Sequence, residues 1–328
     1  MQNDWLEQVE KDIAPKKINE LNHIIAEHIQ YPAIAFFDDK KHPYIGLNKN
    51  SADWKITHEL SVNDINTSNK IALEALKHGA ESLIFQINKS LEENEIKSLL
   101  SGIELDWIET NFIFSNNLSI DDISTFENHI KKIFPESSKA TINYYSKNTN
   151  QHTSYFEFEY LNDDEKNYEI WAKTILSIFE QKAIQKIFIN FKGRSSFIWN
   201  IVQLRSLQLI IDRLCEIEAI EELDFDIHFS VDNEYINSNP HQNMIGLTNI
   251  GMSGILGGAD SISLAIDHEH ESDNIWILSS IHLQYILKEE AKLNKVIDPV
   301  KGSHGIESMT DELCIKLWNY IQLISGQK

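Results

Sequence analysis

The chain has 328 residues, of which 42% are hydrophobic and 24% are charged, so it is long enough to bury the core of one large domain. Its 29 basic and 50 acidic residues give a formal net charge of -21, and a field of that sign repels nucleic acids and anionic lipid surfaces. The sequence contains no long apolar run and no N-terminal signal segment. The two cysteines, Cys215 and Cys314, are too few for a disulfide framework. We therefore expect a cytoplasmic protein that binds neither nucleic acid nor membrane.

The first 60 residues predict an extension rather than part of the main domain. Residues 5–27 carry apolar side chains at helical spacing, interrupted at Pro15, and the next stretch contains Pro32, Pro43 and Gly46, which favour irregular structure. The helical stripe has no predicted strand to cover. We expect this segment to contact a partner chain; the alternative is that it packs back onto the protein's own domain.

From residue 69 onward, helical patterns alternate with short apolar strands, which indicates parallel strands joined by helices. Seven strands are predicted, at residues 81–87, 104–114, 140–146, 155–160, 186–191, 223–230 and 260–266. An eighth strand is predicted at residues 295–298, and helices are predicted at residues 168–181, 196–218, 243–254, 274–292 and 310–325. These units predict a TIM-type (β/α)8 barrel over residues 61–328. The link at residues 148–153 is too short for a helix, so the barrel is expected to be trimmed there.

The predicted strands alternate in a way that separates two faces. In the strand at residues 223–230, the apolar positions 225, 227 and 229 alternate with Asp226, His228 and Ser230. Because the outer face of a barrel strand meets apolar helices, the polar set is expected to point inward. An interior lined by such groups must be internally paired or hydrated, and its acidic residues disfavour an anionic ligand.

Two patterns could carry chemistry of their own. Residues 267–271 read Asp-His-Glu-His-Glu directly after a predicted strand, where His268 and His270 could bind a metal in a barrel hydrolase. No third ligand is evident and a solvated loop is the alternative, so we expect no metal. The glycines between residues 251 and 258 follow a helix, whereas a dinucleotide-binding loop follows a strand. Close helix packing and a turn are therefore the preferred explanation of these glycines.

Four segments of the second half carry a family resemblance. Residues 197–207 (FIWNIVQLRSL) are similar to "FFxEIAKLRAxR", residues 226–245 to "H…TSGWS…DPYNNxxR", residues 256–262 to "LGGxxSL", and residues 296–313 (VIDPVKGSHGIESMTDEL) to "VxDPxGGSYYVExLTDEL". On these motifs the chain resembles the methylmalonyl-CoA mutase family, and residues 79–83 (GAESL) resemble its small subunit. The resemblance extends from about Trp54 to Trp318. It implies a TIM-type barrel that, in the family's catalytic chain, threads coenzyme A along its axis and is capped by a cobalamin domain.

Departures from the family pattern imply that this chain lacks a complete active site. The cobalamin domain of the family carries an Asp-x-His-x-x-Gly motif whose histidine ligates cobalt, and no such motif occurs here. His228 matches the family's substrate-carbonyl histidine by position, so the resemblance makes it the candidate substrate-binding residue; a hydrogen-bonded core histidine is the alternative. Gly246 stands in place of an arginine, and His304-Gly305 in place of a tyrosine pair.

The resemblance therefore implies a small (beta), non-catalytic subunit of adenosylcobalamin-dependent methylmalonyl-CoA mutase, which interconverts methylmalonyl-CoA and succinyl-CoA. It implies a heterodimer in which the large catalytic chain holds the adenosylcobalamin, whereas this chain holds no cofactor, no metal and no catalytic residue. One alternative is an acyl-CoA-binding mutase barrel that borrows a separate cobalamin-binding polypeptide. The other is a metal-dependent barrel hydrolase that uses His268 and His270.

Overall fold

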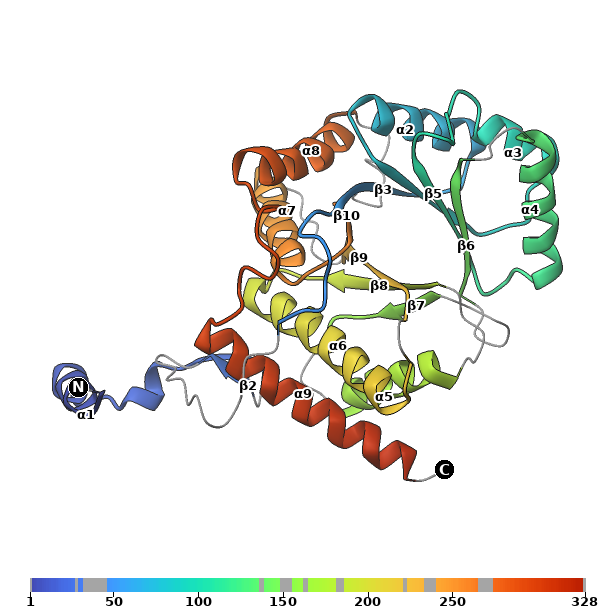
Figure 1. Ribbon diagram of the computed structural model, residues 1–328. Helices are drawn as coiled ribbons and strands as arrows, with labels where there is room; N and C mark the ends of the chain where they lie inside the picture. The colour runs from blue at the N-terminus through green and yellow to red at the C-terminus, as the bar shows by residue number, and fades with distance from the viewer. Residues whose placement is uncertain are drawn as a thin grey trace.

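The computed structural model describes residues 2–26, 29–31, 46–135, 139–147, 155–161, 165–180, 186–220, 223–232, 240–264 and 274–326. Eight parallel strands form one sheet that curls into a nearly closed barrel with helices around it (Figure 1). This arrangement confirms the predicted TIM-type (β/α)8 barrel. Of the helices that the structure describes, none is long and apolar enough to span a membrane.

The barrel strands follow one another around the sheet in chain order. They are β3 (Lys55–Ser61), β4 (Ser82–Ile87), β5 (Glu109–Phe114), β6 (Thr141–Ser146), β7 (Tyr155–Phe158), β8 (Ile187–Gly193), β9 (Phe225–Val231) and β10 (Ser261–Ser263). β10 pairs in parallel with β3, which closes most of the circle. Within the described residues no backbone pairing joins β6 to β7, and the short link predicted between them lies outside those residues. The barrel is therefore open along one seam.

The helices cover the outside of the barrel. They are α2 (Ile65–Lys77), α3 (Glu93–Leu99), α4 (Ile120–Ile133), α5 (Glu165–Glu180), α6 (Phe197–Ile217), α7 (Pro240–Leu256), α8 (Asn274–Tyr285), which continues into the π-helical turn η3 (Ile286–Glu290), and α9 (His304–Ser325). Local chemistry fixes several starts: the Asp64 side chain caps α2, and Ser119 and Asp122 form a capping box at α4. The apolar outer residues of the strands pack against these helices in two large clusters.

The prediction of an eighth strand at residues 295–298 is wrong. That segment forms turns and bends, because Asp298 takes a left-handed backbone conformation (φ 51°) and Pro299 follows it. The missing strand is β3, whose apolar Ile56 and Leu60 are buried on its outer side. The sheet thus includes residues 55–60, which the sequence pattern assigned to the extension.

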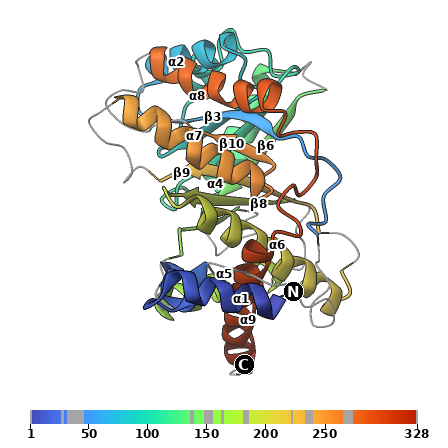
Figure 2. The same cartoon turned by 90° about the vertical axis from the view of Figure 1, so that its left-hand side faces the viewer.

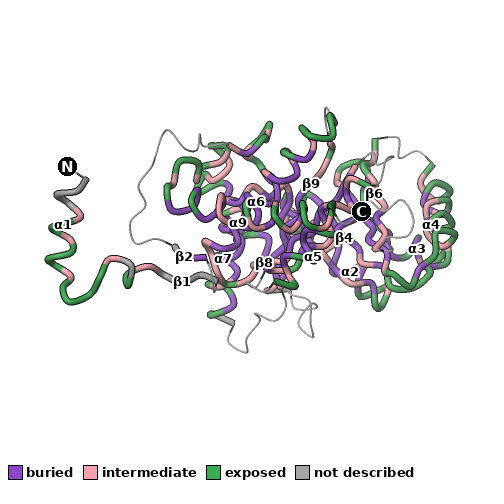
Figure 3. The backbone as a smooth tube through the Cα atoms, turned by 90° about the horizontal axis from the view of Figure 1, so that it is seen from below, coloured by how far each residue is buried: buried purple, intermediate pink, exposed green. Residues whose placement is uncertain are grey.

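The N-terminal segment contains less helix than predicted. Helix α1 (Gln2–Ile13) and the 3-10 helix η1 (Ile18–Leu21) are followed by a two-stranded hairpin, β1 (His23–Ala26) and β2 (Ile29–Tyr31). Strand β2 packs on α9, and Ile29 is fully buried there. Helix α1 instead extends away from the barrel (Figures 1 and 3), and among the described elements it packs substantially only against η1.

Candidate functional site

Strand β9 points Asp226, His228 and Ser230 into the barrel, as the alternation of its residues predicts. The His228 side chain is fully buried, and its Nδ1 atom lies 2.8 Å from Ser261 Oγ. Its Nε2 atom lies 3.6 Å from Glu59 Oε2, and its ring stacks on Phe188 with the centroids 5.6 Å apart. Protein groups therefore surround the candidate histidine on both ring nitrogens and on one face.

The acid beside His228 is Glu59 of β3. Burial alone would raise the pKa of this carboxyl group, but the neighbouring imidazole of His228, together with Gln86 and Lys147, outweighs burial and lowers the pKa below its ordinary value. Gln86 donates a side-chain hydrogen bond to Glu59. Glu59 is therefore an ionised group held by internal partners, which is how this acidic interior is neutralised.

Five side chains from five strands fill the middle of the barrel: Ile84, Ile113, Tyr145, Tyr155 and Phe188. The Phe188 ring lies 4.7 Å from the Tyr145 ring and 5.9 Å from the Tyr155 ring, measured between centroids. Burial raises the pKa of Tyr155 well above its ordinary value, and Asn190 donates a hydrogen bond of 3.1 Å to its hydroxyl. Because the interior of an eight-stranded barrel is just wide enough for side chains, these five residues, the axial plug, occupy the axis.

Toward the carboxyl ends of the strands, inward-facing charges neutralise one another. The carboxylate of Glu157 on β7 forms an ion pair with the Lys192 ammonium group, with Nζ and Oε1 2.6 Å apart. Its other oxygen lies 3.5 Å from Nζ of Lys147, which follows β6. Burial alone would lower the pKa of Lys192, but the hydrogen bond and the charge of Glu157 outweigh that effect and raise the pKa above its ordinary value. The Nζ atom of Lys147 also lies over the Tyr155 ring, 5.5 Å from its centroid. The seam between β6 and β7 is thus bridged by side chains, and these lysines already have a carboxylate partner.

The motifs that carry the family resemblance meet in a buried ionic network. Arg205 of α6 pairs with Asp298 and, at 3.1 Å, with Glu307 of α9, and all three side chains are almost fully buried. Asp298 also accepts the Leu47 backbone N–H at 3.1 Å, and Glu307 accepts the Gly302 backbone N–H at 3.0 Å. The network joins α6, α9 and the segment before β3. The family motif at residues 296–313, which contains Asp298 and Glu307, therefore has a structural role in this chain.

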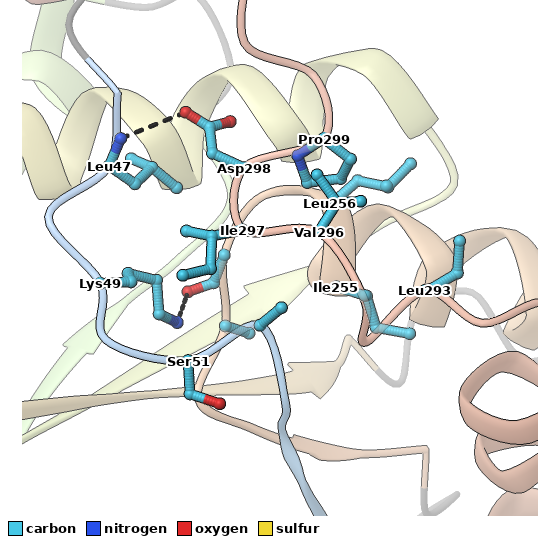
Figure 4. Close-up of a pocket in the computed structure, with 13 residues that line it drawn as sticks. Leu47, Lys49, Ser51, Ile255, Leu256, Leu293, Val296, Ile297, Asp298 and Pro299 are labelled. Atoms are coloured by element: carbon cyan, nitrogen blue, oxygen red, sulfur yellow. Dashed lines mark hydrogen bonds between the residues drawn. The ribbon is translucent and has the colours of Figure 1, made fainter.

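A shallow pocket lies beside this network, at the amino ends of β3 and β10 (Figure 4). Lys49 at its edge donates to the Gly258 carbonyl at 2.6 Å and pairs with Asp260 at 2.6 Å. The remaining wall is mostly apolar and includes Leu256 and Ile297. TIM-barrel enzymes carry their sites at the opposite, carboxyl end, so this pocket is not at the usual catalytic position.

The other sequence candidates contribute no further site. His268 and His270 lie outside the described residues, and the part of the chain that is described contains no group of three or more potential metal ligands. A Cβ atom at Gly254 would lie 2.5 Å from the Phe229 side chain, and one at Gly251 would lie 2.9 Å from Leu264. This confirms close packing as the reason for these glycines.

Sequence comparisons place these features among known proteins. The family model described as methylmalonyl-CoA mutase matches residues 169–327. The chain is 23% identical to the methylmalonyl-CoA mutase small subunit of Porphyromonas gingivalis, covering 85% of this chain and 53% of that protein. It is 26% identical to the methylmalonyl-CoA mutase small subunit of Streptomyces virginiae (44% of this chain, 24% of that one) and 28% identical to the methylmalonyl-CoA mutase of Rhizobium meliloti (42% and 21%). The chain thus spans about half the length of its Porphyromonas relative, and less of the others.

Proposed function

Because the chain belongs to the methylmalonyl-CoA mutase family, we propose that it is a small, non-catalytic subunit that assembles with a larger, catalytic mutase chain. The larger chain would isomerise methylmalonyl-CoA and succinyl-CoA, and this chain would have no activity alone. Two similar proteins are named small subunits, and a small subunit implies a larger one. We further propose that the assembly is a cytoplasmic heterodimer.

The axial plug is the observation that carries this proposal. The family resemblance implies that a catalytic barrel threads coenzyme A along its axis, and in this barrel Tyr145, Tyr155 and Phe188 pack against one another there. An acyl-CoA chain could enter only if several buried aromatic side chains left the core, at a cost of about 3–5 kcal/mol for each large side chain. The plug therefore argues against the alternative in which this barrel binds the acyl-CoA itself.

The described residues also do not fit the cobalt-ligating role. His228 is the only histidine in the sequence that stands two residues after an aspartate, as the family's cobalt-ligating motif requires. It is fully buried between Ser261, Glu59 and Phe188, so it has no room to approach a corrin ring. We propose that adenosylcobalamin, which supplies the radical chemistry in this family, is held by the partner chain. The hydrolase alternative depends on His268 and His270 and stays a prediction, which zinc analysis of protein purified without added metal would test.

Helix α1 supports a partner-subunit role. Its apolar residues Leu6, Val9 and Ile13 lie on one stripe at helical spacing, and α1 packs substantially only against η1 among the described elements. An isolated helix of 12 residues is marginal in water and gains most of its stability from packing. We propose that α1 acts as an arm on the larger chain.

Co-expression with the larger mutase chain of the same genome tests the proposal. We expect the two chains to co-purify at 1:1 stoichiometry, and we expect this chain alone to show no mutase activity with added adenosylcobalamin. The larger chain purified alone is the control. Activity of the isolated chain, or its failure to associate with the larger chain, would refute the proposal.

A further inference from the structure

Helices α2 and α8 meet where the barrel closes. Helix α2 follows the first barrel strand, β3, and α8 follows the last one, β10, which pairs with β3. The two helices contact each other and lie side by side on the outside of the barrel (Figures 1 and 2). The Tyr285 hydroxyl at the end of α8 donates a hydrogen bond of 2.8 Å to the Gly79 carbonyl just after α2. This bond fixes the end of one helix against the end of the other.

Two histidines, His78 and His282, contact each other across this helix pair. His78 caps the C-terminal end of α2, and His282 lies in the last turn of α8. Their ring centroids are 5.7 Å apart, and the ring planes stand at 89° to each other. Two imidazoles that share one zinc ion, at Zn–N distances of about 2.0–2.1 Å, have their centroids about 5–6 Å apart. The two rings are therefore as close as a shared metal ion requires.

A carboxylate orients one of these rings. Glu74 stands four residues before His78, on the same side of α2, and its Oε1 atom lies 2.9 Å from Nε2 of His78. Glu74 also accepts a hydrogen bond of 3.0 Å from Lys77, so two donors hold its carboxylate in place. A neutral His78 that donates to Glu74 carries its proton on Nε2, which leaves the Nδ1 lone pair to bind a metal. Histidine ligands of metal ions ordinarily donate their other N–H to a carboxylate or carbonyl in this way.

The other ring belongs to an accessible side chain. His282 is exposed, and within the described residues neither of its ring nitrogens makes a hydrogen bond or an ion pair. Because rotation about χ2 of histidine is soft, the exposed ring can turn to aim a nitrogen at an ion bound by His78. The net charge of -21 attracts cations to the protein. Since the described residues offer no third ligand, water would complete the coordination of such an ion.

We propose that His78 and His282 form a two-histidine site for a divalent transition-metal ion such as Zn²⁺, with Glu74 as the positioning residue of His78. Imidazole nitrogens suit zinc, copper and nickel, whereas Mg²⁺ and Ca²⁺ take oxygen ligands. The bound ion joins the first helix of the barrel to the helix that follows its last strand, so it stabilises the closed circle. The inference is independent of the mutase role, and the site is distinct from His268 and His270.

Titration with ZnCl₂, followed by isothermal titration calorimetry, tests the inference. The starting protein is the full chain with His268→Gln and His270→Gln, so that these two histidines cannot contribute. We expect it to bind one zinc ion, and we expect His282→Gln to raise Kd at least about tenfold. Glu74→Ala should raise Kd about 10- to 100-fold, the usual cost of losing the partner of a metal-binding histidine. His304→Gln is the matched control, because His304 is also exposed but lies on α9, and its Kd should be unchanged.

Thermal unfolding followed by circular dichroism gives a second measurement. A ligand that binds only the folded state raises Tm, so zinc should raise the Tm of the starting protein but not that of His282→Gln. Without zinc the two proteins should unfold at the same temperature, because the His282 side chain is exposed. If the starting protein shows no saturable zinc binding, or if His282→Gln binds zinc equally tightly, the inference is overturned. The two rings would then form an edge-to-face contact only.

Discussion

Replacing Phe188 by alanine tests whether the axial plug is a packed core. The Phe188 side chain is almost fully buried and contacts the rings of Tyr145, Tyr155 and His228 at centroid distances of 4.7, 5.9 and 5.6 Å. Removing a buried phenylalanine costs about 3–5 kcal/mol, and the cost is larger where the surroundings cannot collapse into the cavity. Strands linked by backbone hydrogen bonds surround Phe188 on β8. We therefore expect Phe188→Ala to lower the free energy of unfolding by about 4 kcal/mol.

Urea unfolding followed by circular dichroism would measure this loss. Phe188→Leu keeps most of the apolar volume and should lose only about 1–1.5 kcal/mol. Trp107→Ala is the surface control: Trp107 is 85% exposed, and we expect a change within about 0.5 kcal/mol. The cavity left by Phe188→Ala should bind benzene and recover part of the lost stability, because empty apolar cavities accept apolar ligands. A loss below about 1 kcal/mol for Phe188→Ala would mean that the axis is loosely filled, and the argument against acyl-CoA binding would fail.

Three further predictions concern the ionic network, the pH dependence of stability and the arm. Arg205→Met removes the cationic partner of the buried acids Asp298 and Glu307, and it should lower the free energy of unfolding in urea by about 3–5 kcal/mol. A loss under about 1 kcal/mol would show that the network is not required. Burial lowers the pKa of His58 from 6.5 to about 4, so the folded state binds its proton less readily than the unfolded state, and stability should fall by about 3 kcal/mol as pH drops from 6.5 to 4. His58→Leu should flatten that part of the pH profile, and an unchanged slope would contradict this assignment. Deleting residues 1–21, which spares the hairpin on α9, should leave the barrel folded but weaken co-purification with the larger chain; undiminished co-purification would rule out the arm.

The two faces of the barrel strands could be read from the sequence because alternation is a local signal. Ile227 and Phe229 are buried on the outer side of β9, and His228 and Ser230 point inward, as the pattern predicts. The pairs that neutralise the interior, such as Glu157 with Lys192, join residues far apart in the chain. No periodicity of one segment specifies such partners. The sequence therefore predicted that the interior acids must be paired but not which residues pair with them.

The errors in the predicted fold have local causes. Residues 55–61 were missed because only Ile56 and Leu60 give an apolar signal, and the polar Thr57 and His58 are buried by packing that the sequence does not reveal. Residues 23–26 continue the helical apolar spacing of the preceding segment, but tertiary pairing with β2 makes them a strand.

Equilibrium dialysis with coenzyme A against the purified complex of this chain and the larger mutase chain tests the central claim most directly. The family resemblance implies that the larger chain is a barrel that binds coenzyme A. We predict that this barrel is the only coenzyme A site of the complex, because the axial plug fills the barrel of the present chain. The expected stoichiometry is one coenzyme A per heterodimer, with no binding to this chain alone. Two coenzyme A molecules per heterodimer, or saturable binding to the isolated chain, would contradict the account.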